Sequence, residues 1–237
     1  MERKSDNSVV TRADKEAERC IRACLASGSR PAYPVLGEEM GDDSAGARFR
    51  WTIDPIDGTL GYTRGLPTFG TLLAFEDATA EQALVGVIHL PSQGQTYWAA
   101  KGRGAFYSSV ESPLGAVSRQ SICVAPRRSF DECVVSLSGE RDFRKAGEQA
   151  GYARICEAAG FLRGNHDCWT HAMTVRGAVD VTVEHSLSRW DIAATQIIVA
   201  EAGGRCLIRP SRVTPKKFDC LFGSPTAVDE VAVLLPF

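Results

Sequence analysis

The stretch WTIDPIDGTL, residues 51–60, places Asp54 and Asp57 three positions apart around a proline, at the end of an apolar run. The simplest interpretation is a proline-containing turn with two solvated carboxylates. The preceding Trp51 and Ile53 favour a different one, because they indicate a buried strand whose end lies near a cleft. We therefore expect both carboxylates at the carboxyl end of a buried strand.

The residues around the two aspartates point to a bound ion. Pro55 stiffens the turn, Gly58 permits close approach of the backbone, and Thr59 can begin a helix whose N–H groups attract an anion. Converging carboxylates need a cation, and oxygen ligands favour Mg²⁺, which commonly bridges protein carboxylates to a phosphate. The stretch therefore predicts a site for a metal ion and a phosphate.

The composition of the chain limits which partners and which cell compartment are expected. The chain has 237 residues, 44% of them hydrophobic, and a formal net charge of −2, so it exerts no general attraction on nucleic acid or an anionic membrane. No apolar run approaches the roughly 20 residues of a membrane span, and the polar start MERKSDN lacks the apolar core of a signal peptide. The eight cysteines include no C-x-x-C pair. We expect most of them to be small buried side chains in a protein of the reducing cytoplasm.

The predicted elements divide the chain into two halves. The first is α+β and largely antiparallel, with a helix over 11–26 and strands over 48–54, 69–75 and 83–90, and the sheet continues over 95–107 with a Gly-rich turn. The second alternates strands over 134–139, 178–184 and 205–208 with helices over 142–159, 167–176 and 190–202. We predict one domain made of subdomains 1–118 and 119–237, with the boundary between about Ser109 and Arg128.

Further acidic residues are ambiguous when each is taken alone. Glu38 and Glu39 follow another apolar run, where an ordinary acidic loop is the simplest interpretation. Asp191 follows Trp190 at a predicted helix start, where it also fits a capping box, and Asp14 presents the same ambiguity.

Taken together, VTRAD, GEE, WTIDPIDGT and WDIAA…EAGG, in that order, resemble the inositol monophosphatase superfamily of Mg²⁺-dependent phosphomonoesterases. The resemblance extends over nearly the whole chain from Lys4 onward. It implies an α/β (α+β) fold, a layered αβαβα sandwich with a mainly antiparallel half that carries the metal site and a smaller α/β half on the substrate side.

The resemblance also implies roles for individual residues. Two or three Mg²⁺ ions, for which Mn²⁺ could substitute, would be held by Glu38, Asp54, the backbone carbonyl of Ile56, Asp57 and Asp191. The N–H groups of Gly58 and Thr59 would bind the phosphate. Asp14 would accept a hydrogen bond from the Thr59 hydroxyl, and this pair, with Glu38, would activate the attacking water.

Substrate choice is expected to lie in the second half. Glu184 stands at the spacing of the family's substrate-contacting glutamate, and GNHDCW, residues 164–169, resembles a segment of the histidinol-phosphate phosphatase branch. Asp167 and Glu184 together would suit an ammonium group. Arg189 could face the phosphate or be a solvated residue at a helix start. His166, which departs from the branch's usual glycine, is given no role.

The resemblance leaves several functions open. The expected ligand is a small phosphorylated metabolite, with histidinol phosphate first and inositol, fructose-bisphosphate or nucleotide-bisphosphate phosphatase activity as alternatives. A metal-binding regulatory protein of the same fold is the alternative outside enzymes, but every motif position is filled, which favours an enzyme. Relatives usually carry a long helix before the segment that matches KSDNSVVTRAD, with which this chain begins. We expect this difference to affect packing and the formation of a homodimer.

Overall fold

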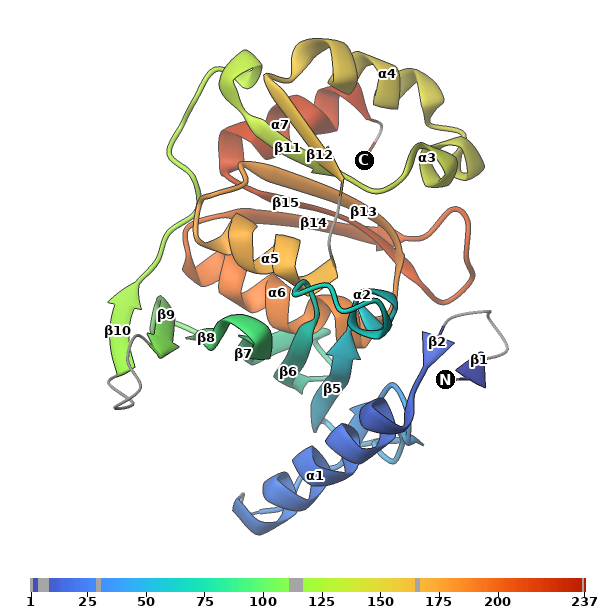
Figure 1. Cartoon of the computed structure of the whole chain (residues 1–237), viewed down its shortest axis with the longest axis vertical. Helices are drawn as coiled ribbons and strands as arrows, with labels where there is room; N and C mark the ends of the chain where they lie inside the picture. Colours follow the sequence, from blue (N-terminus) through green and yellow to red (C-terminus); the bar gives the residue numbers. More distant parts are fainter. Residues whose placement is uncertain (1, 4–8, 29–30, 111–116, 165–166, 236) are drawn as a thin grey trace.

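The computed structural model describes residues 2–3, 9–28, 31–110, 117–164, 167–235 and 237. In this part of the chain, two large sheets alternate with layers of helices (Figure 1). The described residues form a mixed α/β fold of the layered αβαβα type, which confirms the predicted fold class.

The first half builds an eight-stranded sheet in the order β10-β9-β8-β7-β6-β5-β3-β4. All neighbours pair antiparallel except β3 and β5, which are parallel. Its strands are β3 (Val35–Gly37), β4 (Gly41–Asp42), β5 (Phe49–Asp57), β6 (Gly70–Asp77), β7 (Gln82–Leu90), β8 (Gln95–Ala100), β9 (Ala105–Val110) and β10 (Val117–Ser121). The other elements of this half are the paired strands β1 (Glu2–Arg3) and β2 (Val9–Val10), the helices α1 (Arg12–Gly28) and α2 (Thr59–Thr63), and the 3₁₀ turn η1 (Pro91–Gln93).

The second half builds a five-stranded mixed sheet in the order β12-β11-β13-β15-β14. The strand β11 is parallel to both of its neighbours, and β15 is antiparallel to both of its own. The strands are β11 (Val134–Leu137), β12 (Phe161–Gly164), β13 (Val181–Leu187), β14 (Arg205–Pro210) and β15 (Phe218–Gly223). The helices are η2 (Phe130–Glu132), α3 (Glu140–Ala146), α4 (Gln149–Ala158), α5 (Asp167–Val175), α6 (Arg189–Glu201) and α7 (Pro225–Leu234).

The helices α5 and α6 lie between the two sheets, and α4 and α7 cover the far face of the second sheet (Figure 1). A large apolar core joins the first sheet to α5 and α6, and a second one fills the space between the five-stranded sheet and the outer helices. Contact between α6 and the first sheet is close, since a Cβ on Gly86 of β7 would lie 2.5 Å from the Ala194 carbonyl oxygen. This packing fixes the start of α6 beside the end of β5.

Several predicted helices and strands differ from those in the structure. The single helix predicted over 142–159 is two helices, because Gly147 adopts a left-handed φ of 73° and ends α3. The prediction lacked the strands β1 to β4, β10, β12 and β15 and the helix α7. The cysteines are all free thiols. Three of them, Cys133, Cys168 and Cys220, are buried, Cys156 and Cys206 are half-buried, and Cys20, Cys24 and Cys123 are exposed. The expectation that most of them are buried is therefore wrong.

Candidate active site

The strand β5 continues beyond its predicted end at Asp54 and includes Pro55 and Asp57. Its pairing with β6 is irregular between Asp54 and Asp57, because a proline has no N–H to donate to the ladder. The Pro55 carbonyl accepts a hydrogen bond from Thr71 Oγ1 at 2.8 Å, which ties the irregular segment to β6. Gly58 then takes a left-handed φ of 79° and turns the chain into α2.

The carboxylates of Asp54, Asp57 and Asp191 converge, and we call these three residues the acidic cluster. Each offers an oxygen, and these oxygens lie within 4.8 Å of one another. Asp191 also completes a capping box at the start of α6, where the Ser188 N–H donates to Asp191 Oδ2 at 2.6 Å. The capping role and the place in the cluster are thus compatible, because a carboxylate has two oxygens.

The acidic cluster is electrostatically unfavourable in the absence of a cation. Burial raises the pKa of Asp54 well above its ordinary value, and the charges of Glu38 and Asp57 raise it further. Burial and the nearby carboxylate of Asp167 do the same to the pKa of Asp57. Burial raises the pKa of Asp191 to about 7. One buried oxygen, Asp54 Oδ1, has no hydrogen-bond partner among the described residues. A divalent cation would compensate for both features.

These pKa shifts predict how metal binding stabilises the protein at different pH. The folded-state pKa of Asp191 is about 7 against an ordinary 3.8, so between these values the folded protein binds more protons than the unfolded chain. The free energy of unfolding contributed by this group therefore falls as pH rises. Because a metal replaces those protons, the rise in Tm on replacing EDTA with Mg²⁺ should be larger at pH 8 than at pH 5. Calorimetric melting checks this, and an equal or larger rise at pH 5 would contradict it.

Glu38 follows β3, and its N–H donates to the Ile53 carbonyl of β5 at 3.2 Å. Its carboxylate lies close enough to raise the pKa of Asp54. The first sheet thus brings Glu38 to the acidic cluster through the parallel pairing of β3 with β5.

A second polar group lies beside the cluster. Thr59 Oγ1 is 3.1 Å from Asp14 Oδ1 and 2.9 Å from the carbonyl oxygen of Ile56. Asp14 is buried on α1, and its other oxygen accepts hydrogen bonds from the N–H and hydroxyl of Thr11 at 2.7 and 2.6 Å. Asp14 therefore caps its own helix with one oxygen and holds Thr59 with the other.

The start of α5 lies beside Asp57 of the acidic cluster. The N–H of Cys168 donates to Asp57 Oδ2. A Cβ on Gly58 would lie 2.9 Å from Asp167 Oδ2, so a side chain at position 58 would meet the Asp167 carboxylate. The structure thus brings Asp167 against the turn that follows β5. Residue 166, for which no role was predicted, lies outside the described residues.

Glu184 faces inward from β13 and is only 3% exposed. Its Oε2 is 3.2 Å from His171 Nε2, and His171 Nδ1 is 2.8 Å from Thr195 Oγ1. Burial alone would lower the pKa of His171, but the Glu184 carboxylate raises it above its ordinary value. Sequence analysis missed His171, since nothing in its local pattern separates it from any other helical histidine.

The predicted contact of Arg189 with a phosphate needs correction. Its guanidinium binds Glu76 of β6 through Nε at 2.7 Å and the Glu81 carbonyl at 3.2 Å. Burial alone would raise the pKa of Glu76, but Arg189 and the hydrogen bonds from Thr52 and Arg50 hold it below its ordinary value. Arg189 therefore neutralises a buried carboxylate and joins α6 to the first sheet.

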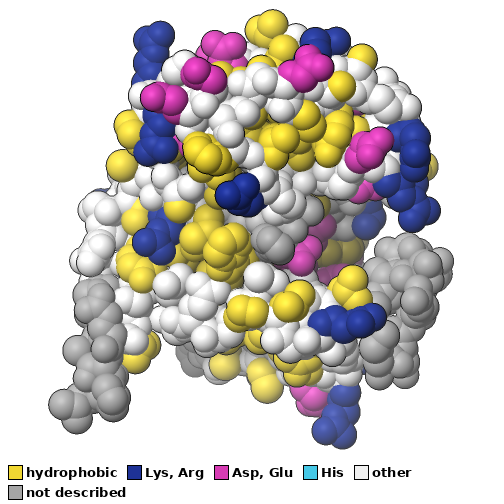
Figure 2. Space-filling model, turned by 45° about the horizontal axis from the view of Figure 1, so that its top comes forward, with side chains coloured by type: hydrophobic (Ala, Val, Ile, Leu, Met, Phe, Trp, Pro, Cys, Tyr) yellow, Lys and Arg dark blue, Asp and Glu magenta, His cyan; other side chains and the backbone are white. Residues whose placement is uncertain are grey.

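Acidic side chains gather in a hollow near the middle of the face shown in Figure 2.

Among the described residues, no helix is both long and apolar enough to cross a membrane.

Comparison with known proteins places this site in a family context. The model of the inositol monophosphatase family matches residues 1–233. A histidinol-phosphatase of Streptomyces coelicolor is 38% identical over 206 residues, which cover 86% of this chain and 75% of the relative. A histidinol-phosphatase of Mycobacterium tuberculosis is 36% identical over 203 residues, which cover 85% of this chain and 75% of the relative. Among solved structures, an IMPase of Thermotoga maritima matches with a TM-score of 0.76 and 29% identity, covering 96% of this chain and 83% of that one.

Proposed function

The chain belongs to the inositol monophosphatase family and is a phosphoric monoester hydrolase, and we propose that it hydrolyses histidinol phosphate with the aid of bound Mg²⁺. The observation that carries the proposal is the convergence of three buried or half-buried carboxylates beside the turn at Gly58. Oxygen-only ligands, and an Asp54 Oδ1 that has no hydrogen-bond partner in the described part of the chain, fit a hard divalent cation.

The residues that would hold Mg²⁺, or Mn²⁺ in its place, are Glu38, Asp54, Asp57, Asp191 and the Ile56 carbonyl. The Ile56 carbonyl oxygen lies 2.9 Å from Thr59 Oγ1, but the single hydroxyl proton can go to Asp14 instead, and a carbonyl has two lone pairs, so it is able to bind an ion. When bound, paired metal ions neutralise phosphate charge and lower the pKa of a coordinated water. This is the chemistry that a phosphate monoester dianion needs, since the dianion otherwise repels an incoming hydroxide.

The chain's own residues orient the reactants. We assign the N–H groups of Gly58 and Thr59 to the phosphate oxygens, supported by the left-handed turn that opens α2. The Thr59 hydroxyl donates toward Asp14 and so directs its lone pairs to the attacking water, whose proton can pass through Thr59 to Asp14 or to Glu38. No covalent intermediate on the protein is required.

The site also supports a proposal on domain organisation. The acidic cluster takes Asp54 and Asp57 from the first half and Asp191 from the second, so neither half is complete alone. We therefore propose a single catalytic domain with subdomains 1–118 and 119–237. The eight free thiols are consistent with a cytoplasmic location, which we propose on that ground.

The substrate proposal rests on Asp167 and on the relatives named histidinol-phosphatase. The Glu184 carboxylate is neutralised in part by His171, so the attraction for an ammonium group falls mainly to Asp167, with Glu184 Oε1 left for a second contact. The alternative, an inositol phosphate, is favoured by the likeness to the Thermotoga maritima IMPase.

Asp167→Asn tests this proposal. Asn tolerates the left-handed φ of 50° found at this position, so the variant removes charge and keeps the backbone. An ion pair or hydrogen bond to a charged group contributes roughly 1.5–3 kcal/mol, so kcat/KM for histidinol phosphate should fall about ten- to a hundredfold. The kcat/KM for inositol 1-phosphate, whose polyol part carries no ammonium group, should be nearly unaffected.

The measurement is phosphate release by both proteins from histidinol phosphate, inositol 1-phosphate, fructose 1,6-bisphosphate and 3′-phosphoadenosine 5′-phosphate. Histidinol phosphate should be the best substrate of the wild type. A preference for inositol 1-phosphate, with equal losses for both esters in the variant, would replace the histidinol proposal by the inositol one.

A further inference from the structure

A second polar constellation lies in the five-stranded sheet, away from the acidic cluster. Ser138 Oγ is 2.8 Å from His185 Nδ1, and His185 Nε2 is 3.0 Å from Glu148 Oε2. All three residues are buried, with exposures of 5%, 8% and 3%. A serine hydroxyl, an imidazole and a carboxylate are joined in the order of a catalytic triad, with the two ring nitrogens exchanged, since Nδ1 faces the serine and Nε2 faces the carboxylate.

The position of Ser138 in the fold fits a nucleophile. Ser138 directly follows β11, a strand with parallel neighbours on both sides, and Gly139 then leads into α3. This strand–turn–helix position carries the nucleophile in α/β-hydrolases, where the triad follows the chain order serine, acid, histidine. The order Ser138, Glu148, His185 is the same. The G-x-S-x-G pattern is absent, since Ser136 and Glu140 occupy the glycine positions, which is why sequence analysis did not select this serine.

A cavity of about 230 Å³ opens beside the serine. It lies at the carboxyl ends of β11 and β12. After β11 the chain continues to α3 and α4, and after β12 it continues to α5, which lies on the opposite face of the sheet (Figure 1). Divergence of this kind between adjacent parallel strands produces ligand crevices in α/β sheets. The cavity is lined by Leu137, Ser138, Gly139, Tyr152, Leu162, Arg163 and Gly164.

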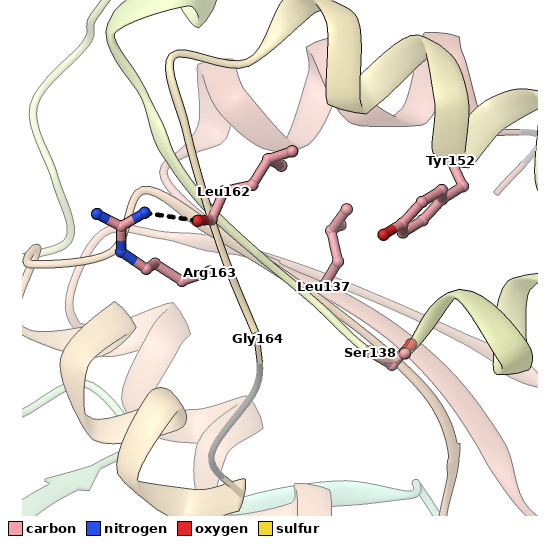
Figure 3. Close-up of a pocket in the computed structure, with 7 residues that line it drawn as sticks. Leu137, Ser138, Tyr152, Leu162, Arg163 and Gly164 are labelled. Carbon is pink, nitrogen blue, oxygen red and sulfur yellow. Dashed lines mark hydrogen bonds between the residues drawn. The ribbon is translucent and has the colours of Figure 1, made fainter.

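The cavity suits a small uncharged ligand. Figure 3 shows Leu137 and the ring of Tyr152 beside Ser138, and the Arg163 guanidinium turned back to the Leu162 carbonyl, to which it donates at 2.7 Å. The walls are therefore mostly apolar, and the one cationic side chain in the lining, Arg163, is hydrogen-bonded to the backbone of its neighbour Leu162. The volume is below the roughly 300–1,000 Å³ of pockets for drug-sized ligands, so the cavity encloses only a short chain.

Neighbouring side chains hold Ser138, His185 and Glu148 in place. The His185 ring packs edge-on against Phe143, with ring centroids 4.5 Å apart. Burial alone would raise the pKa of Glu148, but the hydrogen bonds from His185 and Arg209 hold it below its ordinary value. Glu148 is therefore an anion at neutral pH and can stabilise a protonated His185. Arg209 and Arg212 also bind Glu148, which fixes the carboxylate.

We propose that the chain has a second, metal-independent activity, the hydrolysis of short uncharged carboxylic esters by Ser138 in this cavity. Ser138 Oγ forms a bond to the acyl carbon while its proton passes to His185 Nδ1. The bond to the leaving alkoxide breaks as His185 returns that proton, and the alcohol departs. Water then attacks the acyl-serine by the same route, which releases the carboxylic acid and restores the serine. The N–H of Gly139, the residue after the nucleophile, is the candidate donor to the oxyanion.

The test is hydrolysis of p-nitrophenyl acetate and p-nitrophenyl butyrate by the full chain in EDTA, with phosphate release in Mg²⁺ measured in parallel. Ser138→Ala should lower ester kcat/KM at least about a hundredfold, because it removes the nucleophile. The matched control is Ser136→Ala, which removes a buried hydroxyl of β11 that has no histidine partner among the described residues. Phosphate release, which does not depend on this proposal, should persist in both variants and reports that they are folded.

A fluorophosphonate probe followed by peptide mass spectrometry locates the nucleophile directly. The expected adduct is on Ser138 in the wild type and in Ser136→Ala, at equal rates with EDTA or Mg²⁺. Ester hydrolysis that is equal in Ser138→Ala and wild type, or an adduct on another residue, would overturn the proposal and make Ser138, His185 and Glu148 a structural network. Should Ser138→Ala fail to fold, the adduct on the wild-type protein still decides between the two.

Discussion

Asp57→Asn is expected to abolish phosphate release, with kcat/KM at least about a thousandfold below that of the wild type. The loss should exceed the 10–100-fold typical of residues that only support metal ligands, because Asp57 belongs to the acidic cluster itself. The substitution removes one negative charge and almost no volume. Asn retains an oxygen that can accept the hydrogen bond from the Cys168 N–H, so the start of α5 should keep its place.

This prediction is checked by phosphate release at saturating Mg²⁺, with circular dichroism and melting to confirm the fold. Asp142→Asn, a change of the same kind at a half-buried residue in the first turn of α3, serves as the matched control and should have wild-type activity. The melting temperature of Asp57→Asn in EDTA should not fall, since the variant relieves repulsion among buried carboxylates. Wild-type turnover in Asp57→Asn would remove Asp57 from the catalytic machinery.

Thr59→Ala is expected to lower kcat by about 10²–10⁴-fold while changing KM little. The hydroxyl lies between Asp14 and the Ile56 carbonyl, where it can orient the attacking water, a contribution made mainly in the transition state. The backbone N–H of residue 59 remains in the variant, so contact with the phosphate in the ground state should persist.

Steady-state kinetics of three variants separate this role from simple phosphate binding. Thr59→Ser keeps the hydroxyl and should recover most of the activity. Thr63→Ala removes a hydroxyl from the other end of α2, where it bonds only the Leu60 carbonyl, and should behave as wild type. If Thr59→Ala raised KM and left kcat unchanged, Thr59 would be an anchor for the phosphate, and Asp14 would serve only as a helix cap.

The parts of the site that sequence analysis located are those where local pattern and chemistry coincide. The apolar run before Asp54 predicted a strand, the periodicity after Trp190 predicted a helix, and both elements are present. The resemblance of the motifs, in their order along the chain, to those of the inositol monophosphatase family then implied a common site. Their convergence requires α6 to pack on the first sheet, a contact between residues more than a hundred positions apart that no local pattern encodes.

Other features depend on tertiary contacts and could not be predicted in this way. Arg189 has the same local sequence whether it faces solvent, a phosphate or Glu76, and only the packing of α6 against β6 selects Glu76. Ser138 and His185 are 47 positions apart and meet because β11 and β13 are neighbours in the sheet. The break between α3 and α4 does have a local signal in Gly147, which the helical periodicity around it concealed.

Calorimetric titration of Mg²⁺ into the wild-type protein and into Asp57→Asn, both first stripped with EDTA, tests the central claim most directly when phosphate release is measured on the same samples. Metal-dependent hydrolysis at the acidic cluster predicts that the stripped wild type is inactive, that it binds Mg²⁺ and regains turnover as it does so, and that the variant binds Mg²⁺ more weakly without regaining activity. Undiminished hydrolysis by the wild type in excess EDTA, or identical isotherms for two equally active proteins, would contradict it.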